Sequence, residues 1–129
     1  MVRNGDAHLK NFGVGYDEAW GARLAPMYDV VTTAIYRYQR WQGAEEEEDR
    51  TLALRLFAGR GQSRAYPTTE ELQRFGRQVC GVAQPAPVLA RIADALADTL
   101  AEARQDARVP PALLADMAAM WQRGMGYAR

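Results

Sequence analysis

The stretch Asn4-Gly5-Asp6-Ala7-His8-Leu9-Lys10-Asn11, with Tyr28-Asp29 further along the chain, decides how the rest of the sequence is interpreted. It contains the only His and the only Lys of the protein, whereas all other basic residues are arginines. One Asp, an Asn five residues later and a second Asp eighteen residues after that supply three oxygen-bearing side chains. Phosphoryl transfer with Mg²⁺ uses groups of this kind. The stretch is therefore a candidate site.

Each of these residues has a chemical role open to it. Asp6 can deprotonate an incoming hydroxyl, Asn11 can turn its amide oxygen toward a metal ion, and Asp29 can bind that ion directly. If the stretch is extended, Lys10 points away from Asn11 and can contact a phosphate or pair with a carboxylate. We expect His8 to orient its neighbours through a hydrogen bond rather than to act as a base or a metal ligand.

A purely structural interpretation of the same residues stays open. Asn4-Gly5-Asp6 is typical of a turn, which Asn11 can cap, and Tyr28-Asp29 can cap a following helix. For any one residue this interpretation is the stronger one. For Asp6, His8, Asn11 and Asp29 together, at this spacing, a functional site is favoured.

Composition limits the classes of function. A chain of 129 residues forms one domain, 1–129, and its zero net charge creates no general attraction for nucleic acid or an anionic membrane. The single Cys80 excludes an internal disulfide and fits a cytoplasmic location; we expect it to be a small buried apolar residue. No apolar run is long enough to span a bilayer. One His is too few for a two-metal phosphoesterase.

The first half of the chain predicts short elements. Residues 12–14 and 23–25 predict the strands of a hairpin that has Asn11 at one end and Asp29 beyond the other. Residues 30–38 predict a short helix, although their β-branched and aromatic residues also suit a strand. The acidic run 45–49 predicts a solvated, mobile loop. Alternation over 52–56 predicts a half-buried strand or extended segment. Arg60 and Arg64, in a glycine-rich loop, are expected to face solvent, with phosphate contact as the alternative.

The second half, from about residue 66 to 125, predicts a helical bundle. Thr68 and Glu71 have the spacing of a capping box, and Gly81 suits the end of that helix. A second helix is expected over 87–107 and a third after Pro110-Pro111. The residues expected to face inward are Leu72, Phe75 and Val79; Val88, Leu89, Ile92, Leu96, Thr99 and Leu100; and Leu113, Leu114, Met117, Met120 and Trp121. The fold class is mainly α, within α+β, with a short N-terminal hairpin.

Two motifs carry a resemblance to a known family. Asn4-Gly5-Asp6-x-His8-x-Lys10-Asn11-Phe12 and Leu24-Ala25-Pro26-x-Tyr28-Asp29-Val30 resemble the HipA family of bacterial toxin serine/threonine kinases. The resemblance implies the helical C-lobe of a kinase-like fold, whose hairpin, within residues 1–33, carries the catalytic loop and the metal-binding segment. It also implies that Asp6 is the catalytic base and that Asn11 and Asp29 bind Mg²⁺. We expect His8 and Lys10 to belong to the catalytic residues with Asp6, and Lys10 to contact the ATP together with Asn11 and Asp29.

The resemblance also implies partners and a missing part. Its family acts on a protein substrate in the cytoplasm and pairs with a helix-turn-helix, HipB-like antitoxin, whereas no direct nucleic-acid or membrane binding is expected of this chain. No glycine-rich phosphate loop or ATP-positioning lysine precedes Asp6, so we expect the N-terminal nucleotide-binding lobe to be absent and the chain alone to be a weak or inactive kinase. The alternative is a non-enzymatic docking module for the antitoxin, or a chain that self-associates through the surface exposed where that lobe would sit.

Overall fold

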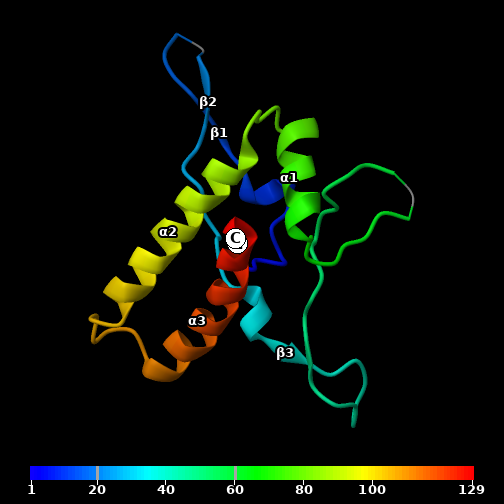
Figure 1. Ribbon diagram of the computed structural model, residues 1–129, viewed down its shortest axis with the longest axis vertical. Helices are drawn as coiled ribbons and strands as arrows, with labels where there is room; N and C mark the ends of the chain where they lie inside the picture. Colours follow the sequence, from blue (N-terminus) through cyan, green and yellow to red (C-terminus); the bar gives the residue numbers. More distant parts are fainter. Residues whose placement is uncertain (20, 60) are drawn as a thin grey trace.

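The protein has an α+β fold in which three helices form one layer and short strands and loops lie beside it (Figure 1). The computed structural model describes residues 1–19, 21–59 and 61–129. The helices are α1 (Thr69–Gln78), α2 (Pro85–Ala103) and α3 (Pro111–Met125), and the strands are β1 (Val14–Tyr16), β2 (Ala22–Leu24), β3 (Arg37–Tyr38) and β4 (Glu47–Glu48). Three 3₁₀ turns complete the list: η1 (Leu9–Asn11), η2 (Thr33–Ile35) and η3 (Gly126–Ala128). The predicted fold class is confirmed.

The core lies where α2 packs against α3 and α1. Its most buried apolar side chains are four residues of α2 and one of η2, namely Leu89, Ala93, Leu96, Leu100 and Ala34. The α2 residues recur every three or four positions, as one face of a helix requires. Because α3 also contacts η2, the helical layer supports the segment that follows the hairpin.

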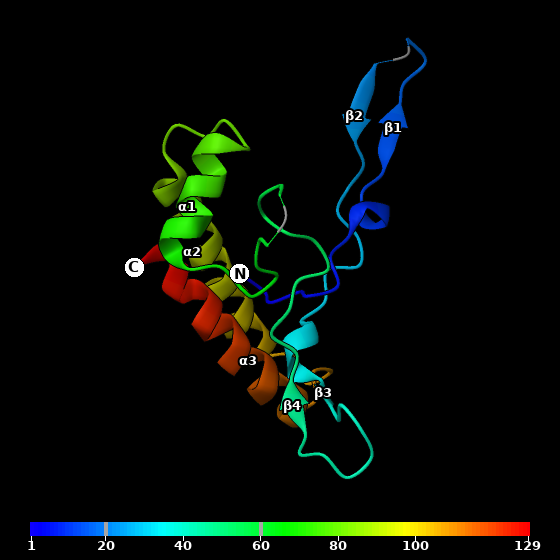
Figure 2. The same cartoon turned by 90° about the vertical axis from the view of Figure 1, so that its right-hand side faces the viewer.

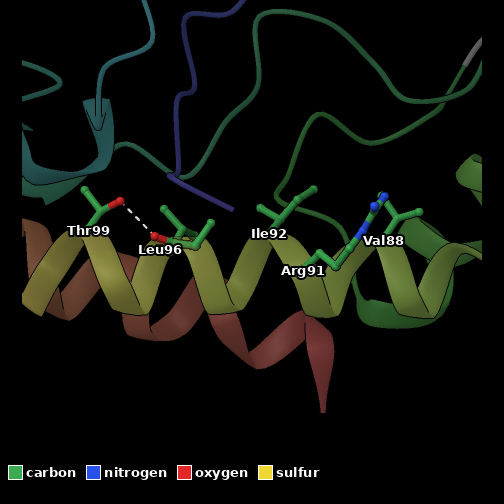
Figure 3. Close-up of a pocket in the computed structure, with 6 residues that line it drawn as sticks. Val88, Arg91, Ile92, Leu96 and Thr99 are labelled. Atoms are coloured by element: carbon green, nitrogen blue, oxygen red, sulfur yellow. Dashed lines mark hydrogen bonds between the residues drawn. The ribbon is translucent and has the colours of Figure 1, made fainter.

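The predicted inward face of α2 was wrong at two positions. Ile92 is 42% exposed and Thr99 is exposed, whereas Ala93, which was not predicted, is buried. Ile92 and Thr99 stand with Val88 and Arg91 on one side of α2, in a shallow surface hollow on the side away from α3 (Figure 3). The small side chain of Ala93 suits the contact face because it lets neighbouring elements approach α2 closely.

The capping box of α1 is confirmed. Thr68 Oγ1 accepts from the backbone N–H of Glu71, and the Glu71 carboxylate accepts from the backbone N–H of Thr68. Gly81 follows the helix with a φ of +67°, a left-handed conformation that glycine adopts readily. Leu72 and Phe75 are half-buried, but the predicted burial of Val79 and of Cys80 was wrong. Val79, the residue that follows α1, is 57% exposed, and Cys80 is exposed.

We expect Thr68→Ala to lower the stability of the protein by about 0.5–2 kcal/mol, since it removes one partner of the cap and exposes an unpaired helix N–H. Thermal unfolding followed by circular dichroism measures the effect. Thr69→Ala is the matched control, because Thr69 lies inside the first turn and accepts no cap hydrogen bond. Equal melting temperatures for the two variants would show that the box contributes nothing.

Helix α3 attaches to the N-terminal half through a tryptophan. Trp121 Nε1 donates to the buried Thr32 Oγ1 at 2.7 Å, across 89 residues of chain. Leu114, Met117 and Met120 are half-buried, as predicted, whereas the predicted burial of Leu113 was wrong, since it is 41% exposed. The Trp121–Thr32 contact fixes the start of η2 on the helical layer.

The hairpin forms where it was predicted, with shifted ends. Strands β1 and β2 pair antiparallel, with Val14 opposite Leu24 and Tyr16 opposite Ala22, so these four side chains share one face. Figure 2 shows the hairpin projecting away from the helical layer. Val14, Tyr16 and Leu24 are 53%, 66% and 76% exposed, so nothing in the described part of the chain covers this apolar face.

Two predictions between residues 30 and 50 were wrong. The segment 30–38 has only the single turn η2 followed by β3, because its aromatic and β-branched residues favour extended backbone. Strand β4 pairs with β3 within the acidic run that was expected to be solvated, and the side chain of Glu48 is only 13% exposed. It lies 3.3 Å from Arg123 and 3.6 Å from Arg50, which compensate its charge.

The strand or extended segment predicted over 52–56 was wrong, because the chain bends at residues 53, 54 and 56 and Leu54 is 42% exposed, whereas Leu52 and Leu56 are half-buried. An isolated bridge pairs the preceding residue, Thr51, with Ala65. Arg60, one of the two arginines considered for phosphate contact, lies outside the described residues. No helix in residues 1–19, 21–59 and 61–129 combines the length and apolarity needed to cross a bilayer.

Candidate active site

The turn Asn4-Gly5-Asp6 is fixed by hydrogen bonds to both backbone polar groups of Gly5. The Gly5 N–H donates to Thr33 Oγ1 at 2.6 Å, and the Gly5 carbonyl accepts from the backbone N–H of Ala53 at 2.6 Å. A Cβ at Gly5 would lie 2.5 Å from the Thr51 carbonyl oxygen, so no larger residue fits. The structural interpretation of this triplet as a turn is therefore correct, and the turn fixes the backbone that carries Asp6.

The segment after the turn is the 3₁₀ turn η1, not the extended stretch assumed for Lys10. The Asn11 N–H donates to the His8 carbonyl at 3.0 Å, and Asn11 Oδ1 accepts from the His8 N–H at 2.8 Å. Asn11 thus closes η1, of which it is part, and not the Asn4-Gly5-Asp6 turn that the structural alternative had it cap. The Lys10 side chain is exposed, and its ammonium has no hydrogen bond or ion pair with any described residue.

Asn11 and Asp29 are brought into direct contact across the hairpin. Asn11 Nδ2 donates to Asp29 Oδ2 at 2.5 Å, and the hydroxyl of Tyr28 donates to the Lys10 carbonyl. Residues eighteen apart in the sequence therefore lie side by side. Asp29 does not cap the next helical turn, because the residue that precedes η2 is Thr32.

Asp29 has a left-handed backbone conformation, and the side chain of Asn4 hydrogen-bonds to its carbonyl. Its φ is +55°, in the left-handed region that a residue with a Cβ rarely adopts. Asn4 Nδ2 donates to the Asp29 carbonyl at 3.0 Å, while Asn4 Oδ1 accepts from the Asp6 N–H at 3.1 Å. One side chain thus connects the backbone of Asp6 with the backbone of Asp29.

Asp6 lines a cavity of about 540 Å³ on the side toward the loops at 49–53 and 64. Thr33, Arg37, Thr51 and Arg64 are among the other lining residues, so Arg64 lies near Asp6 although its phosphate contact was not favoured from the sequence. Asn11 and Asp29 do not line this cavity. Asp6 therefore lines an open hollow that the paired Asn11 and Asp29 do not share.

His8 orients Asn11 through its backbone. The hydrogen bond to Asn11 Oδ1 comes from the His8 N–H, and the buried ring Nδ1 has no partner among the described residues. The orienting hydrogen bond expected of His8 is therefore made by its backbone N–H and not by ring Nδ1.

The turn depends on residues that the sequence did not single out. The Arg3 carbonyl accepts from the backbone N–H of Ala34 at 3.3 Å and from the Tyr66 hydroxyl at 3.0 Å. Burial raises the pKa of Tyr66 above its ordinary value, which favours the protonated phenol that donates this hydrogen bond. Arg3 and Tyr66 are 63 residues apart and no local pattern joins them, whereas the side-chain chemistry of Asn4, which is common in turns, was a usable signal.

Comparison with known proteins identifies the family of the chain. The family model described as HipA-like C-terminal domain matches residues 1–106, which include the turn, the hairpin, α1 and α2. The chain therefore belongs to the family of HipA-like C-terminal domains, and the resemblance found in the sequence is confirmed.

One relative is named for an activity. The protein named Putative kinase Y4mE, from Sinorhizobium fredii, is 47% identical to this chain over 36 residues, which are 28% of this chain and 8% of that protein. The match thus spans less than a tenth of the relative's length. No solved structure matches the chain.

Proposed function

We propose that this chain provides the catalytic residues of a Mg²⁺-dependent kinase that transfers phosphate from ATP to a serine or threonine of a protein. The observation that carries the proposal is the contact between Asn11 Nδ2 and Asp29 Oδ2. The Asn4 side chain also hydrogen-bonds to both the Asp6 N–H and the Asp29 carbonyl, which connects Asp6 to this pair. The name of Y4mE and the family membership favour kinase chemistry over other uses of two carboxylates and an amide.

Asn11 and Asp29 fit Mg²⁺ by their donor chemistry. Mg²⁺ binds oxygen, through one or two carboxylates or an amide, and keeps its remaining positions for water and phosphate. The described residues contain no cluster of three or more His, Cys, Asp or Glu that suits a dedicated metal cage, and a two-ligand Mg²⁺ site needs none. Asn11 Oδ1 already accepts one hydrogen bond but has a second lone pair. When bound, Mg²⁺ would offset the charge of the ATP phosphates.

Asp6 is assigned the role of general base. The acceptor hydroxyl would enter the 540 Å³ cavity beside it. Asp6 accepts the hydroxyl proton as the hydroxyl oxygen bonds to the γ-phosphorus, and the bond from that phosphorus to the ADP oxygen breaks. The exposed carboxylate of Asp6 is accessible to such a substrate.

Lys10 and His8 have supporting roles in this proposal. The exposed Lys10 ammonium is available to contact an ATP phosphate, because no described residue pairs with it. His8 holds Asn11 through the backbone hydrogen bond described above. The single cysteine of the sequence fits a cytoplasmic location for this reaction.

We expect phosphate transfer by the 129-residue chain alone to be slow, below about 1 per minute, against roughly 1–100 per second for protein kinases. The sequence contains no glycine-rich phosphate loop, and loss of about 4 kcal/mol of nucleotide affinity weakens ATP binding about a thousandfold. Transfer from radiolabelled ATP to a generic protein substrate measures the rate. Turnover above that limit would show that nucleotide binding needs no additional lobe.

A docking module is the second candidate, favoured by the uncovered apolar face of the hairpin. Val14, Tyr16 and Leu24 are each more than half exposed, which suits a protein contact such as the family's helix-turn-helix antitoxin or a second copy of the chain. Size-exclusion chromatography with and without the antitoxin tests this role. A chain that stays monomeric and elutes apart from the antitoxin would argue against it.

A further inference from the structure

We infer that Asn4 is a positioning residue. Its side chain fixes the position of the turn that carries Asp6 relative to Asp29, and the Asn11–Asp29 contact depends on it. This inference rests on the proposed function, because positioning matters only if Asp6 and Asp29 act on one substrate complex. Its basis is the pair of hydrogen bonds that Asn4 makes in opposite directions, at 3.1 Å to the Asp6 N–H and 3.0 Å to the Asp29 carbonyl.

The left-handed backbone of Asp29 needs support of this kind. A non-glycine residue in a sparsely populated φ/ψ region costs about 1–3 kcal/mol and persists where surrounding contacts determine it. Asp29 is exposed and follows a hairpin that packs on little, so core packing does not determine its φ of +55°. The described contacts that hold it are polar: Asn4 at its carbonyl and Asn11 at its carboxylate.

The chemistry of an amide explains why Asn serves here. The Asp6 N–H needs an acceptor and the Asp29 carbonyl needs a donor, and only a side chain with both groups satisfies them together. Asp at position 4 would keep the acceptor and lose the donor. Ala would lose both. Comparing the two substitutions therefore distinguishes the effect of losing the hydrogen bond within the turn from the effect of losing the hydrogen bond to Asp29.

The experiment is NMR of the whole chain, with the Asn11 side-chain amide as the reporter. In Asn4→Ala, we expect the backbone amide of Asp6 and the side-chain amide of Asn11 both to shift. In Asn4→Asp, we expect the Asp6 amide to stay near its wild-type position while the Asn11 side-chain amide shifts. Gln105→Ala, at an exposed position after α2, is the control and should move neither.

The outcomes separate this inference from the proposed function. An Asn11 side-chain amide unchanged in both Asn4 variants would overturn the inference, whatever the kinase activity. Shifted resonances support it even if phosphate transfer is never detected, because the readout requires no ATP. If Asn4→Ala unfolds, as lost signal dispersion would show, Asn4→Asp alone decides.

Mn²⁺ affinity provides a second test, because it would not change if Asn4 only stabilised its own turn. Removal of a residue that orients a metal ligand typically weakens metal affinity about 10–100-fold. We expect Asn4→Ala to weaken Mn²⁺ binding at Asn11 and Asp29 by about tenfold. Unchanged Mn²⁺ affinity in a folded Asn4→Ala variant would contradict the inference.

Discussion

Asp6→Asn is expected to lower phosphate transfer by roughly 10²–10⁴-fold, because it removes the group assigned to accept the hydroxyl proton. The reduction should appear in the turnover rate, with little change in the affinity for ATP, since Asp6 lines the cavity assigned to the acceptor hydroxyl, whereas Asn11 and Asp29 do not. It can be measured by single-turnover transfer from radiolabelled ATP, in this chain or in any longer protein that contains it.

The control for this prediction is Asp98→Asn, which neutralises an exposed carboxylate on α2. It should transfer phosphate at the wild-type rate and melt at the wild-type temperature. An Asp6→Asn variant that keeps more than about a tenth of the wild-type rate would remove Asp6 from the role of general base, which typically contributes at least 10²-fold.

Gly124→Ala is expected to destabilise the protein by about 1–3 kcal/mol, although Gly→Ala inside a helix normally stabilises by about 1 kcal/mol. Gly124 is buried in α3, and a Cβ there would lie 1.8 Å from the carbonyl oxygen of Met1 and 2.7 Å from its carbonyl carbon. Because the obstacle is backbone, the segment leading into Arg3 and Asn4 must move. Chemical unfolding measures the change in stability.

Gly126→Ala is the matched control for Gly124→Ala. Gly126 lies two residues further on, has a φ of −56°, and a Cβ there meets nothing within 4 Å. We expect its stability to equal or slightly exceed that of the wild type. If both variants unfolded at the same denaturant concentration, the close approach of Met1 to α3 would be wrong.

The elements predicted best were those whose determinants are close in sequence. The capping box needs only Thr68 and Glu71, and both partners lie within one turn of helix. The hairpin and α2 were also located, but α2 was assigned the wrong burial at Ile92 and Thr99, because periodicity alone does not say which side its neighbours occupy.

The elements predicted worst depend on contacts between distant residues. Glu48 is half-buried because Arg123, 75 residues later, meets it, and no pattern in the acidic run reveals that partner. The same applies to the site. Chemistry selected Asn11 and Asp29, which do meet, but the sequence did not show that Asn4 connects Asp6 to Asp29 or that Tyr66 supports the turn.

The central claim is that Asn11 and Asp29 together bind a divalent ion, and Mn²⁺ titration observed by NMR tests it directly. At substoichiometric Mn²⁺ we predict broadening of the Asn11 side-chain amide and the Asp29 backbone amide. Excess Mg²⁺ should reverse the broadening and Asp29→Asn should abolish it. Broadening confined to the acidic run 45–49, with Asn11 and Asp29 unaffected, would contradict the claim.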